Sequence, residues 1–305
     1  MKRMIVAATL AGLSTVAYSE FELNDVEISG YIDMSMSMTD GEDGSHTTAG
    51  LDTYEIRFAT ELADGFSVEA HIAGDGDSDI ELEQAFLTYS GVSNLTITAG
   101  KFLSSLGWEA YHAPDLFQYS TSATLVYPGM QNGVGVKYTH EWFDVYGAAL
   151  ASAWEDDDLE DGAFEGHVRM TGLENFTLFV GGAVEDRTSY DKMLLNIWAS
   201  YVLGDLTLAA EFNGVAGWEA KDEDGYGWLL MANYKFTEKL GLTLRTSALT
   251  IDDASDTTIT EDLKFTIAPS YTFTDNFSMV AEFNTIEDVA NESTQTYALE
   301  GILTF

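Results

Sequence analysis

Apolar and polar residues alternate along most of the chain beyond residue 20, in short segments separated by polar turns. In segment 277–283, which reads FSMVAEF, every second residue is apolar, whereas Ser278 and Glu282 lie on the opposite face of an extended chain. Segments 206–213 and 263–267 repeat this pattern. Alternation with one polar face predicts antiparallel strands, because the strands of a buried parallel sheet are apolar on both faces.

The alternating segments are numerous and evenly spaced. Sixteen strands are predicted, at 26–38, 51–62, 65–74, 80–90, 95–102, 130–140, 143–153, 163–171, 176–186, 192–203, 206–217, 225–236, 241–251, 260–273, 277–286 and 294–305. Short turns between them alternate with longer acidic loops, which are expected at 39–50, 155–162, 185–191, 219–225, 252–258 and 287–293. Short turns at one end and longer loops at the other are typical of outer-membrane β-barrels.

The polarity of the two strand faces separates a membrane barrel from a soluble β-sandwich. One face of segment 226–236 carries aromatic residues at both ends and aliphatic residues between them, as lipid-facing strands do. The opposite faces of other strands carry Glu211, Arg245 and Glu282, and a dry core does not tolerate so many charges. The sequence therefore predicts an all-β fold, a transmembrane antiparallel β-barrel of about sixteen strands around a water-filled lumen.

The N-terminus predicts export. Lys2 and Arg3 precede an apolar run over 4–16, and Ala17-Tyr18-Ser19 is a small-x-small cleavage site. This pattern is typical of a secretory signal peptide, and the alternative is a buried N-terminal helix. We expect a signal peptide at 1–19, a barrel domain at 20–305 and delivery to the bacterial outer membrane.

Composition narrows the function. The chain has no cysteine, and its 51 acidic and 13 basic residues give a formal net charge of −38. Such a charge argues against binding nucleic acid or anionic lipid through bulk electrostatics. Divalent cations that bridge the acidic loops to lipopolysaccharide are compatible with it, as is a plain solvated surface.

One stretch interrupts the alternation. Between 103 and 129 the chain has no period of two, and a loop of this length in a compact β protein usually has a function. Counted from the N-terminus, it follows the fifth strand and is the third long loop. It contains the residues for which we expect a role at a constriction, namely Trp108, Glu109, Tyr111, His112 and Asp115.

Motifs around this stretch resemble a known family. Gly100-Lys101-Phe102, Gly107-Trp108-Glu109 and Tyr119-Ser120-Thr121-Ser122 resemble the OmpL-like β-barrel porins, and segment 131–136 resembles their next strand, with Asn132 where those proteins have Thr. The alternate apolar residues that end at Phe305 resemble the insertion signal of outer-membrane proteins. The strand count resembles the general bacterial porins, in which the third loop folds into the lumen. These resemblances imply a pore narrowed by the loop at 103–129, and they do not imply a substrate.

Charged residues that face the lumen follow from strand parity. The bases are Arg57, Lys137, Arg169, Lys235, Arg245 and Lys264, and the acids are Asp33, Glu55, Glu69, Glu165, Glu211, Glu282 and Glu300. Fixed charge at the narrowest point of a pore sets its ion preference. Because acids outnumber bases, we expect a preference for cations, although some of these residues are expected only to pair with neighbours on the wall.

Other chemistry has little support in the sequence. The five histidines are scattered and lack the spacing of a metal motif, so no metal and no cofactor is expected. An outer-membrane hydrolase with a Ser-His-acid site remains an alternative, because its members need not be adjacent in sequence. Further alternatives are a sugar- or small-molecule-selective channel and a structural or adhesive barrel that conducts nothing.

The expected function is therefore a porin, not an enzyme, that admits small hydrophilic solutes and ions passively. Its expected partners are outer-membrane lipid and lipopolysaccharide, those solutes, and two further copies in a homotrimer. The small residues Gly147, Ala149, Ala151 and Ala153 form a stripe that could pack against a neighbouring copy or face lipid.

The signal peptide gives the first prediction. We expect the exported protein to begin at Glu20, because the cleavage site ends at Ser19. N-terminal sequencing of protein purified from outer membranes measures this. A mature chain that still begins at Met1 would contradict it.

Overall fold

The computed structural model describes residues 26–42, 44–76, 80–124, 126–154, 162–187 and 189–305. The predicted signal peptide at 1–19 and most of the predicted loop at 155–162 lie outside these residues. No helix in the described part of the chain is long and apolar enough to cross a membrane.

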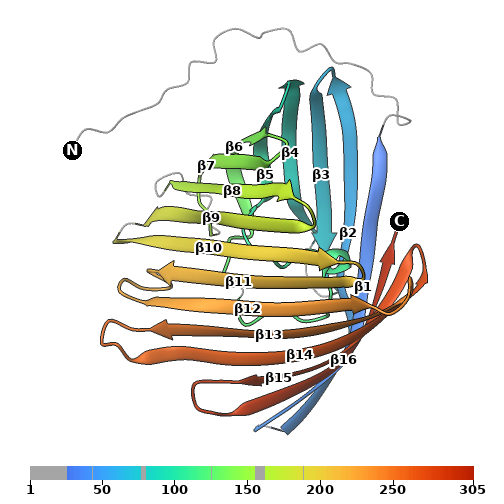
Figure 1. Ribbon diagram of the computed structural model, residues 1–305, viewed down its shortest axis with the longest axis vertical. Coiled ribbons are helices and arrows are strands. Elements are labelled where there is room, and N and C mark those ends of the chain that lie inside the picture. Colours follow the sequence, from blue (N-terminus) through green and yellow to red (C-terminus); the bar gives the residue numbers. More distant parts are fainter. Residues whose placement is uncertain (1–25, 43, 77–79, 125, 155–161, 188) are drawn as a thin grey trace.

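The fold is a closed antiparallel barrel in which each strand pairs with its neighbours in the sequence (Figure 1). The strands are β1 (Glu27–Gly41), β2 (Gly44–Ala63), β3 (Phe66–Gly74), β4 (Glu81–Val92), β5 (Leu95–Leu103), β6 (Met130–Thr139), β7 (Phe143–Leu150), β8 (Ala163–Leu173), β9 (Phe176–Arg187), β10 (Tyr190–Leu203), β11 (Leu206–Ala216), β12 (Asp224–Lys235), β13 (Leu240–Asp252), β14 (Thr258–Thr274), β15 (Phe277–Glu287) and β16 (Ser293–Thr304). The predicted fold class and strand number are confirmed.

The first and last strands close the barrel. Gly30 N–H donates to the Phe305 carbonyl oxygen and Phe305 N–H donates to the Gly30 carbonyl oxygen, both at 3.0 Å. The ladder continues from Tyr31 opposite Thr304 to Asp40 opposite Gln295. Closure leaves no unpaired sheet edge, which a bilayer requires because lipid tails cannot satisfy backbone hydrogen-bonding groups.

The two faces of the wall differ as the alternation predicts. On β12, Tyr226, Leu230 and Tyr234 are exposed on the outer face, whereas Leu229 and Met231 are buried against the interior. The same outward stripe of apolar side chains continues around the barrel, and it matches the hydrocarbon of a bilayer.

Two predicted loops are instead strand. The predicted loop at 39–50 is wrong, because β1 and β2 continue to a hairpin next to Gly41 and Gly44. Polar cross-strand bonds support this extension: Ser37 Oγ lies 2.9 Å from Thr48 Oγ1, and other paired residues there are threonines. The predicted loop at 185–191 is likewise mostly strand, since β9 ends at Arg187 and β10 begins at Tyr190.

The expected stripe of small outward residues is only partly correct. Gly147 and Ala149 are exposed on β7, but this strand ends at Leu150. Ala151 and Ala153 are buried, and Ala153 N–H donates to Glu185 Oε2 at 2.7 Å. The chain therefore turns inward at this point and presents no continuous outward stripe.

Two β-bulges break the strand parity on one side of the barrel. Asp33 pairs with Thr53 and Met34 with Leu51, so Asp52 is an extra residue in β2. In the same way, the partners of His71 and Ile72 are Gln84 and Leu82, so Glu83 is an extra residue in β4. A bulge re-aims side chains, because the inserted residue shifts the alternation by one.

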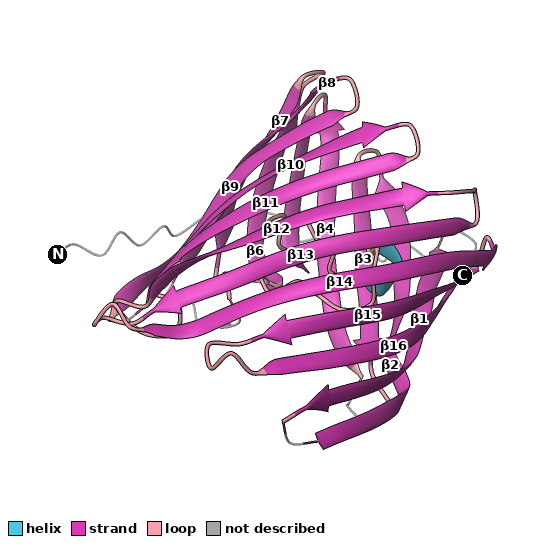
Figure 2. Ribbon diagram, turned by 60° about the horizontal axis from the view of Figure 1, so that its bottom comes forward, coloured by secondary structure: helices cyan, strands magenta, loops and turns pink. Residues whose placement is uncertain are grey.

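The connection between β5 and β6, residues 104–129, is called the inserted loop here. Figure 2 shows the short helix η2 (Ala113–Asp115) of this loop within the ring of strands, and η2 contacts β16. The loop therefore crosses the lumen from β5 toward the opposite wall. This agrees with a constriction loop in the lumen.

The glycine before the inserted loop gives the second prediction. Gly100 has φ +134°, and a Cβ there would collide with the Ala85 carbonyl oxygen and lie 2.8 Å from Phe86 Cα. We expect Gly100→Ala to destabilise the barrel by about 1–3 kcal/mol, through backbone strain and the clash. Urea titration of the folded protein in detergent micelles measures the free energy of unfolding.

Gly147→Ala is the matched control. It adds the same methyl group to a nearby strand where no atom lies within 4 Å of the new Cβ. We expect its free energy of unfolding to equal that of the wild type. Equal stability of the two variants would refute the role of Gly100.

Candidate functional site

The inserted loop is held by carboxylates of the barrel wall, beginning with Glu165 on β8. Ser104 Oγ donates to Glu165 Oε2 at 2.6 Å, and Ser105 donates through N–H at 2.9 Å and through Oγ at 2.7 Å to Glu165 Oε1. Gln131 Nε2 adds a bond of 2.8 Å. Glu165 is thus buried with both oxygens satisfied, and it fixes the start of the loop.

A second anchor lies on β10 and β11. Gly107 N–H donates to Asn196 Oδ1 at 3.1 Å, and Trp108 N–H donates to Glu211 Oε1 at 2.9 Å. Tyr127 Oη donates to Glu211 Oε2 at 2.8 Å. Burial and the charges of Glu211 and Glu109 raise the pKa of Tyr127 well above its usual value, so its hydroxyl keeps its proton as a donor. The two ends of the loop therefore share one carboxylate.

The centre of the loop surrounds a buried arginine. Arg245 on β13 forms an ion pair with Glu109 of the loop, and both side chains are almost fully buried. Its guanidinium also donates to the carbonyl oxygens of Ser120 at 2.8 Å and Thr121 at 3.0 Å. Glu109 in turn accepts from Ser122 N–H at 2.8 Å. Hydrogen bonds of Nη1, Nη2 and Glu109 offset much of the cost of burying this ion pair, while Arg245 Nε is buried without a hydrogen-bond partner among the described residues.

The far end of the loop meets the remaining wall. Ser120 donates to Glu282 on β15, through N–H at 3.1 Å and through Oγ at 2.5 Å. Lys264 Nζ donates to the Thr121 carbonyl oxygen at 2.8 Å. Three wall carboxylates, Glu165, Glu211 and Glu282, thus accept backbone N–H groups of the loop.

On the opposite side, His112 joins the loop to β2 and β4. Its Nε2 lies 2.9 Å from Glu55 Oε2 and 3.4 Å from Glu83 Oε2. Burial alone would lower the pKa of His112, but the two carboxylates raise it to about 9. The imidazole therefore carries a proton at neutral pH, and this anchor weakens as the pH rises through about 9.

A cavity, called the acidic passage here, lies between the inserted loop and the wall at β1, β2, β4 and β16. It has a volume of about 700 Å³ and is lined by the acids Asp33, Asp52, Asp75, Glu83 and Glu300, together with polar and aromatic loop residues. No arginine or lysine of the described chain lines it. Asp33 Oδ1 and Asp52 Oδ2 are buried and have no hydrogen-bond partner among the described residues.

Two further hollows border the inserted loop. One, of about 460 Å³, has a mixed lining that includes Lys137, Arg169, Asp144, His167 and aromatic side chains. The other, of about 310 Å³, lies between Pro114 and Phe117 of the loop and strands β12 to β16. Their linings contain bases, so the passage beside β1–β4 is the acidic one.

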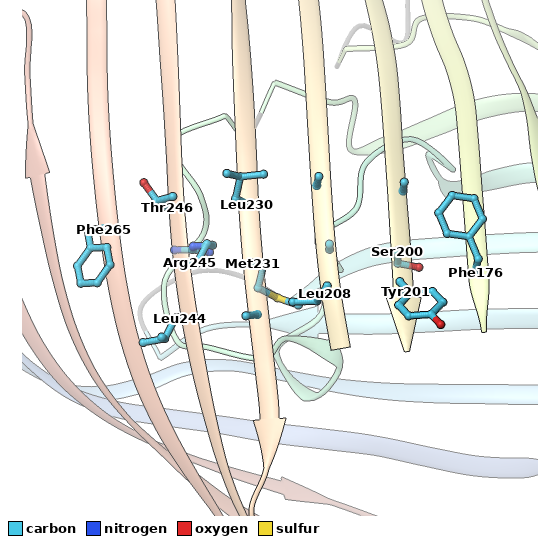
Figure 3. A pocket seen from close by; sticks show the side chains of 14 residues that line it. Phe176, Ser200, Tyr201, Leu208, Leu230, Met231, Leu244, Arg245, Thr246 and Phe265 are labelled. Atoms are coloured by element: carbon cyan, nitrogen blue, oxygen red, sulfur yellow. The ribbon is translucent and has the colours of Figure 1, made fainter. Parts of the chain in front are cut away.

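A separate apolar groove of about 480 Å³ lies on the outer side of the barrel. Figure 3 shows its residues on neighbouring strands, with exposed Leu208, Leu230, Leu244 and Phe265 among them. Arg245 follows Leu244 on the same strand but reaches the loop inside. The groove thus belongs to the lipid-facing surface of the barrel.

The five predicted residues of the loop have different surroundings. Trp108 packs on Trp198, with ring centroids 5.3 Å apart, and Glu109 is neutralised by Arg245. Tyr111 is exposed and its ring lies 5.2 Å from that of His112. Asp115 is exposed at the end of η2. Glu109 is therefore part of the scaffold of the loop, in contrast to the expected role as a charge that meets passing ions.

Most of the predicted wall residues fall into three groups. Glu211, Arg245, Lys264 and Glu282 bind the inserted loop, and Asp33 and Glu300 line the acidic passage. Wall pairs form the third group: Arg57 pairs with Glu55, and Arg169 Nη2 lies 2.7 Å from Asp144 Oδ2. Lys137 lines the hollow with the mixed lining.

Strand parity missed Asp52 and Glu83. Parity places both on the outer face, next to inward Thr53 and Gln84, but each is the extra residue of a bulge and lines the passage. The signal was present in Glu83-Gln84, because two polar residues in succession do not fit a strand with one lipid-facing side. The histidines are scattered in the sequence, but the fold brings His71 and His112 together, with ring centroids 6.4 Å apart.

One arrangement bears on the hydrolase alternative. Ser105 Oγ lies 2.8 Å from His167 Nδ1, and His167 Nε2 lies 3.1 Å from Asp144 Oδ1. A serine hydrolase also needs donors for an oxyanion. The N–H groups of Ser105, Leu106 and Gly107 already donate to Glu165, Ser104 and Asn196. These hydrogen bonds hold the loop in place. The three N–H groups beside Ser105 Oγ are therefore not free to bind an oxyanion.

A closed sixteen-stranded barrel with an apolar outer face, a charged lumen and an inserted loop defines an outer-membrane porin fold. The chain belongs to the family described as "Putative beta-barrel porin-2, OmpL-like", whose model matches residues 45–301. This membership places the protein in the bacterial outer membrane, with a channel role in general terms. No curated protein sequence matches the chain.

Solved structures share this fold at low sequence identity. OmpT of Vibrio cholerae is 12% identical, with 92% of this chain and 97% of that one covered and a TM-score of 0.70. An anion-selective porin from Comamonas acidovorans is 11% identical, with 92% and 99% covered and a TM-score of 0.72. The outer membrane channel DcaP of Acinetobacter baumannii is 14% identical, with 92% and 97% covered and a TM-score of 0.71.

The buried ion pair gives the third prediction. Arg245→Met leaves Glu109 charged and buried without its partner, so we expect a loss of about 3–5 kcal/mol in the free energy of unfolding. The double variant Arg245→Met/Glu109→Gln removes both charges, and we expect it to recover part of the loss. Urea titration in micelles measures both effects.

Arg169→Met is the matched control. Arg169 also pairs with a wall carboxylate, but its side chain is 43% exposed and its partner is Asp144 on β7. We expect this variant to lose much less free energy of unfolding than Arg245→Met. If the double variant were less stable than Arg245→Met alone, the ion pair would not explain the loss.

Proposed function

We propose that this protein is a passive diffusion pore for small hydrophilic solutes and ions that prefers cations. The observation that carries the proposal is the passage of about 700 Å³ lined by Asp33, Asp52, Asp75, Glu83 and Glu300, without a base among its described lining residues. A narrow polar opening between low-dielectric walls focuses the field of its fixed charges. Several carboxylates there attract cations and repel anions.

The distribution of bases supports the same proposal. Arg245 is buried against Glu109 and the loop carbonyls, and Arg57 pairs with Glu55. Lys264 donates to the Thr121 carbonyl oxygen. The positive charges closest to the passage are therefore offset by local partners, whereas the acids of the passage are not matched by bases in its lining.

The fold does not determine ion preference. The porin from Comamonas acidovorans that shares this fold is described as anion-selective. Selectivity in such barrels is thus a property of the side chains at the narrowest opening. For this chain, those side chains are the acids of the passage and the loop residues that face them.

The proposed assembly is a homotrimer in outer-membrane lipid and lipopolysaccharide. One structure that shares the fold is a trimer form of Vibrio cholerae OmpT. Each barrel of this chain contains its own passage, so the proposed pore needs no residue from a second copy. The proposed mature chain is 20–305, after removal of 1–19.

Ion selectivity gives the fourth prediction. In planar bilayers under a KCl gradient, we expect the reversal potential of the wild type to show preference for K⁺ over Cl⁻. Neutralising three acids of the passage, in Asp33→Asn/Asp52→Asn/Glu300→Gln, should move the permeability ratio toward unity. The physical reason is the loss of fixed negative charge at the narrowest point.

A control with the same change in net charge is Asp64→Asn/Glu174→Gln/Asp275→Asn. These residues are exposed in short turns between strands, outside the lining of the passage. We expect the control to keep the wild-type reversal potential. A wild type that prefers Cl⁻, or a control that shifts as much as the lumenal triple variant, would refute the proposal.

A further inference from the structure

Four side chains that can bind a metal ion meet at the edge of the acidic passage. They are Glu55 on β2, His71 on β3, Glu83 on β4 and His112 in the inserted loop, and one ligand atom of each lies within 4.8 Å of the others. The chain brings them together from positions up to 57 residues apart. Three come from neighbouring strands, and the fourth comes from the loop that crosses the lumen.

The separations fit a small coordination sphere. Glu55 Oε2 lies 2.9 Å and Glu83 Oε2 lies 3.4 Å from His112 Nε2, and His71 Nδ1 lies 3.4 Å from Glu55 Oε1. Tetrahedral ligands at about 2.0–2.2 Å from a zinc ion are roughly 3.4 Å apart. The His112–Glu83 and His71–Glu55 pairs are therefore already at the required separation, and the most distant ligand atoms, up to 4.8 Å apart, approach by side-chain rotation when an ion binds.

The cluster is shielded from solvent. The side chain of Glu55 is completely buried, and those of His71, His112 and Glu83 are 6%, 9% and 13% exposed. His71 Nε2 is buried and has no hydrogen-bond partner among the described residues. The nearest carboxylate to this nitrogen is Glu69, whose Oε1 lies 3.8 Å away, so a further acid lies beside the cluster.

The local backbone directs one ligand into the cluster. Glu83 is the extra residue of the bulge in β4, and without the bulge it would lie on the outer face. Gln84, which follows it, also faces inward, and its Nε2 lies 3.0 Å from His71 Nδ1. Bulges are frequent beside binding sites because they re-aim a side chain in this way.

We propose that Glu55, His71, Glu83 and His112 form a binding site for one divalent transition-metal ion, with Zn²⁺ as the best match. Two imidazole nitrogens and two carboxylate oxygens suit zinc and its neighbours in the first transition row. Calcium and magnesium prefer sites made of oxygen atoms only. The ligand set therefore distinguishes this site from the exposed acidic loops.

A bound ion would take the place of the proton that His112 holds between the two carboxylates. It would join the inserted loop to three strands through direct coordination bonds, and it would neutralise charge beside the passage, since Glu83 is part of its lining. The site thus couples metal binding to the position of the loop and to the field in the pore. Without a metal, the same residues act as a hydrogen-bonded anchor.

Isothermal titration calorimetry of the full folded chain in detergent micelles, freed of metal by chelation, tests the proposal with ZnCl₂ as the probe. As the fifth prediction, we expect the titration to show one saturable zinc site per chain, and we expect zinc binding to persist in excess CaCl₂. We expect His71→Gln/His112→Gln to abolish that site and Glu83→Gln to weaken its affinity at least about tenfold, because each variant removes ligand atoms. The heat of zinc binding does not depend on conductance. The metal site can therefore be refuted without refuting the proposed pore function, and the reverse also holds.

His46→Gln/His140→Gln is the matched control, because it removes two histidines that lie outside the cluster. We expect it to bind zinc as the wild type does. Heat-dependent mobility in gels shows whether each barrel is folded. If the double histidine variant does not fold, Glu83→Gln, which preserves side-chain size, tests the site through its zinc affinity. Absence of saturable zinc binding in the wild type, or equal zinc binding by folded His71→Gln/His112→Gln, would overturn the proposal.

Discussion

The structure depends on how a loop of irregular backbone is satisfied inside a membrane barrel. The backbone N–H and carbonyl groups of the strands pair with one another, but most N–H groups of the inserted loop have no ladder to join. Glu165, Glu211 and Glu282 on the wall supply the acceptors, and Arg245 supplies donors for the loop carbonyls. Charged groups are strong hydrogen-bonding partners, so a few of them hold a long segment. The loop is thus a part of the folded barrel.

This use of charge divides the lumen into two kinds of residue. Charges that bind the loop are buried and locally neutralised, as Glu109 and Arg245 are. Charges that remain beside the passage, among them Asp33 and Asp52, have carboxylate oxygens without a hydrogen-bond partner in the described chain. A count of acids and bases along the lumen therefore says little about ion preference. The arrangement around the loop decides which charges act on a solute.

The sequence predicts the barrel well because apolar and polar residues alternate along its strands. Alternation fixes which side faces lipid, and the absence of alternation locates the loop between Leu103 and Met130. Local pattern fails where pairing depends on distant contacts. The extension of β1 and β2 through 39–50 rests on cross-strand bonds between polar residues, and the meeting of His71 with His112 depends on the path of the loop. The partner of Glu109 lies 136 residues away on β13, so no local pattern could identify it.

The two bulges have a consequence for how such a pore can evolve. Asp52 and Glu83 are each extra to the ladder, since the residues on both sides already have partners on the neighbouring strand. Loss of one codon at either position would leave a regular strand with its flanking pairs unchanged. A lineage could therefore gain or lose a lumenal carboxylate through a single in-frame insertion or deletion. Permeation can change in this way while the lipid-facing stripe of the same strand stays in register.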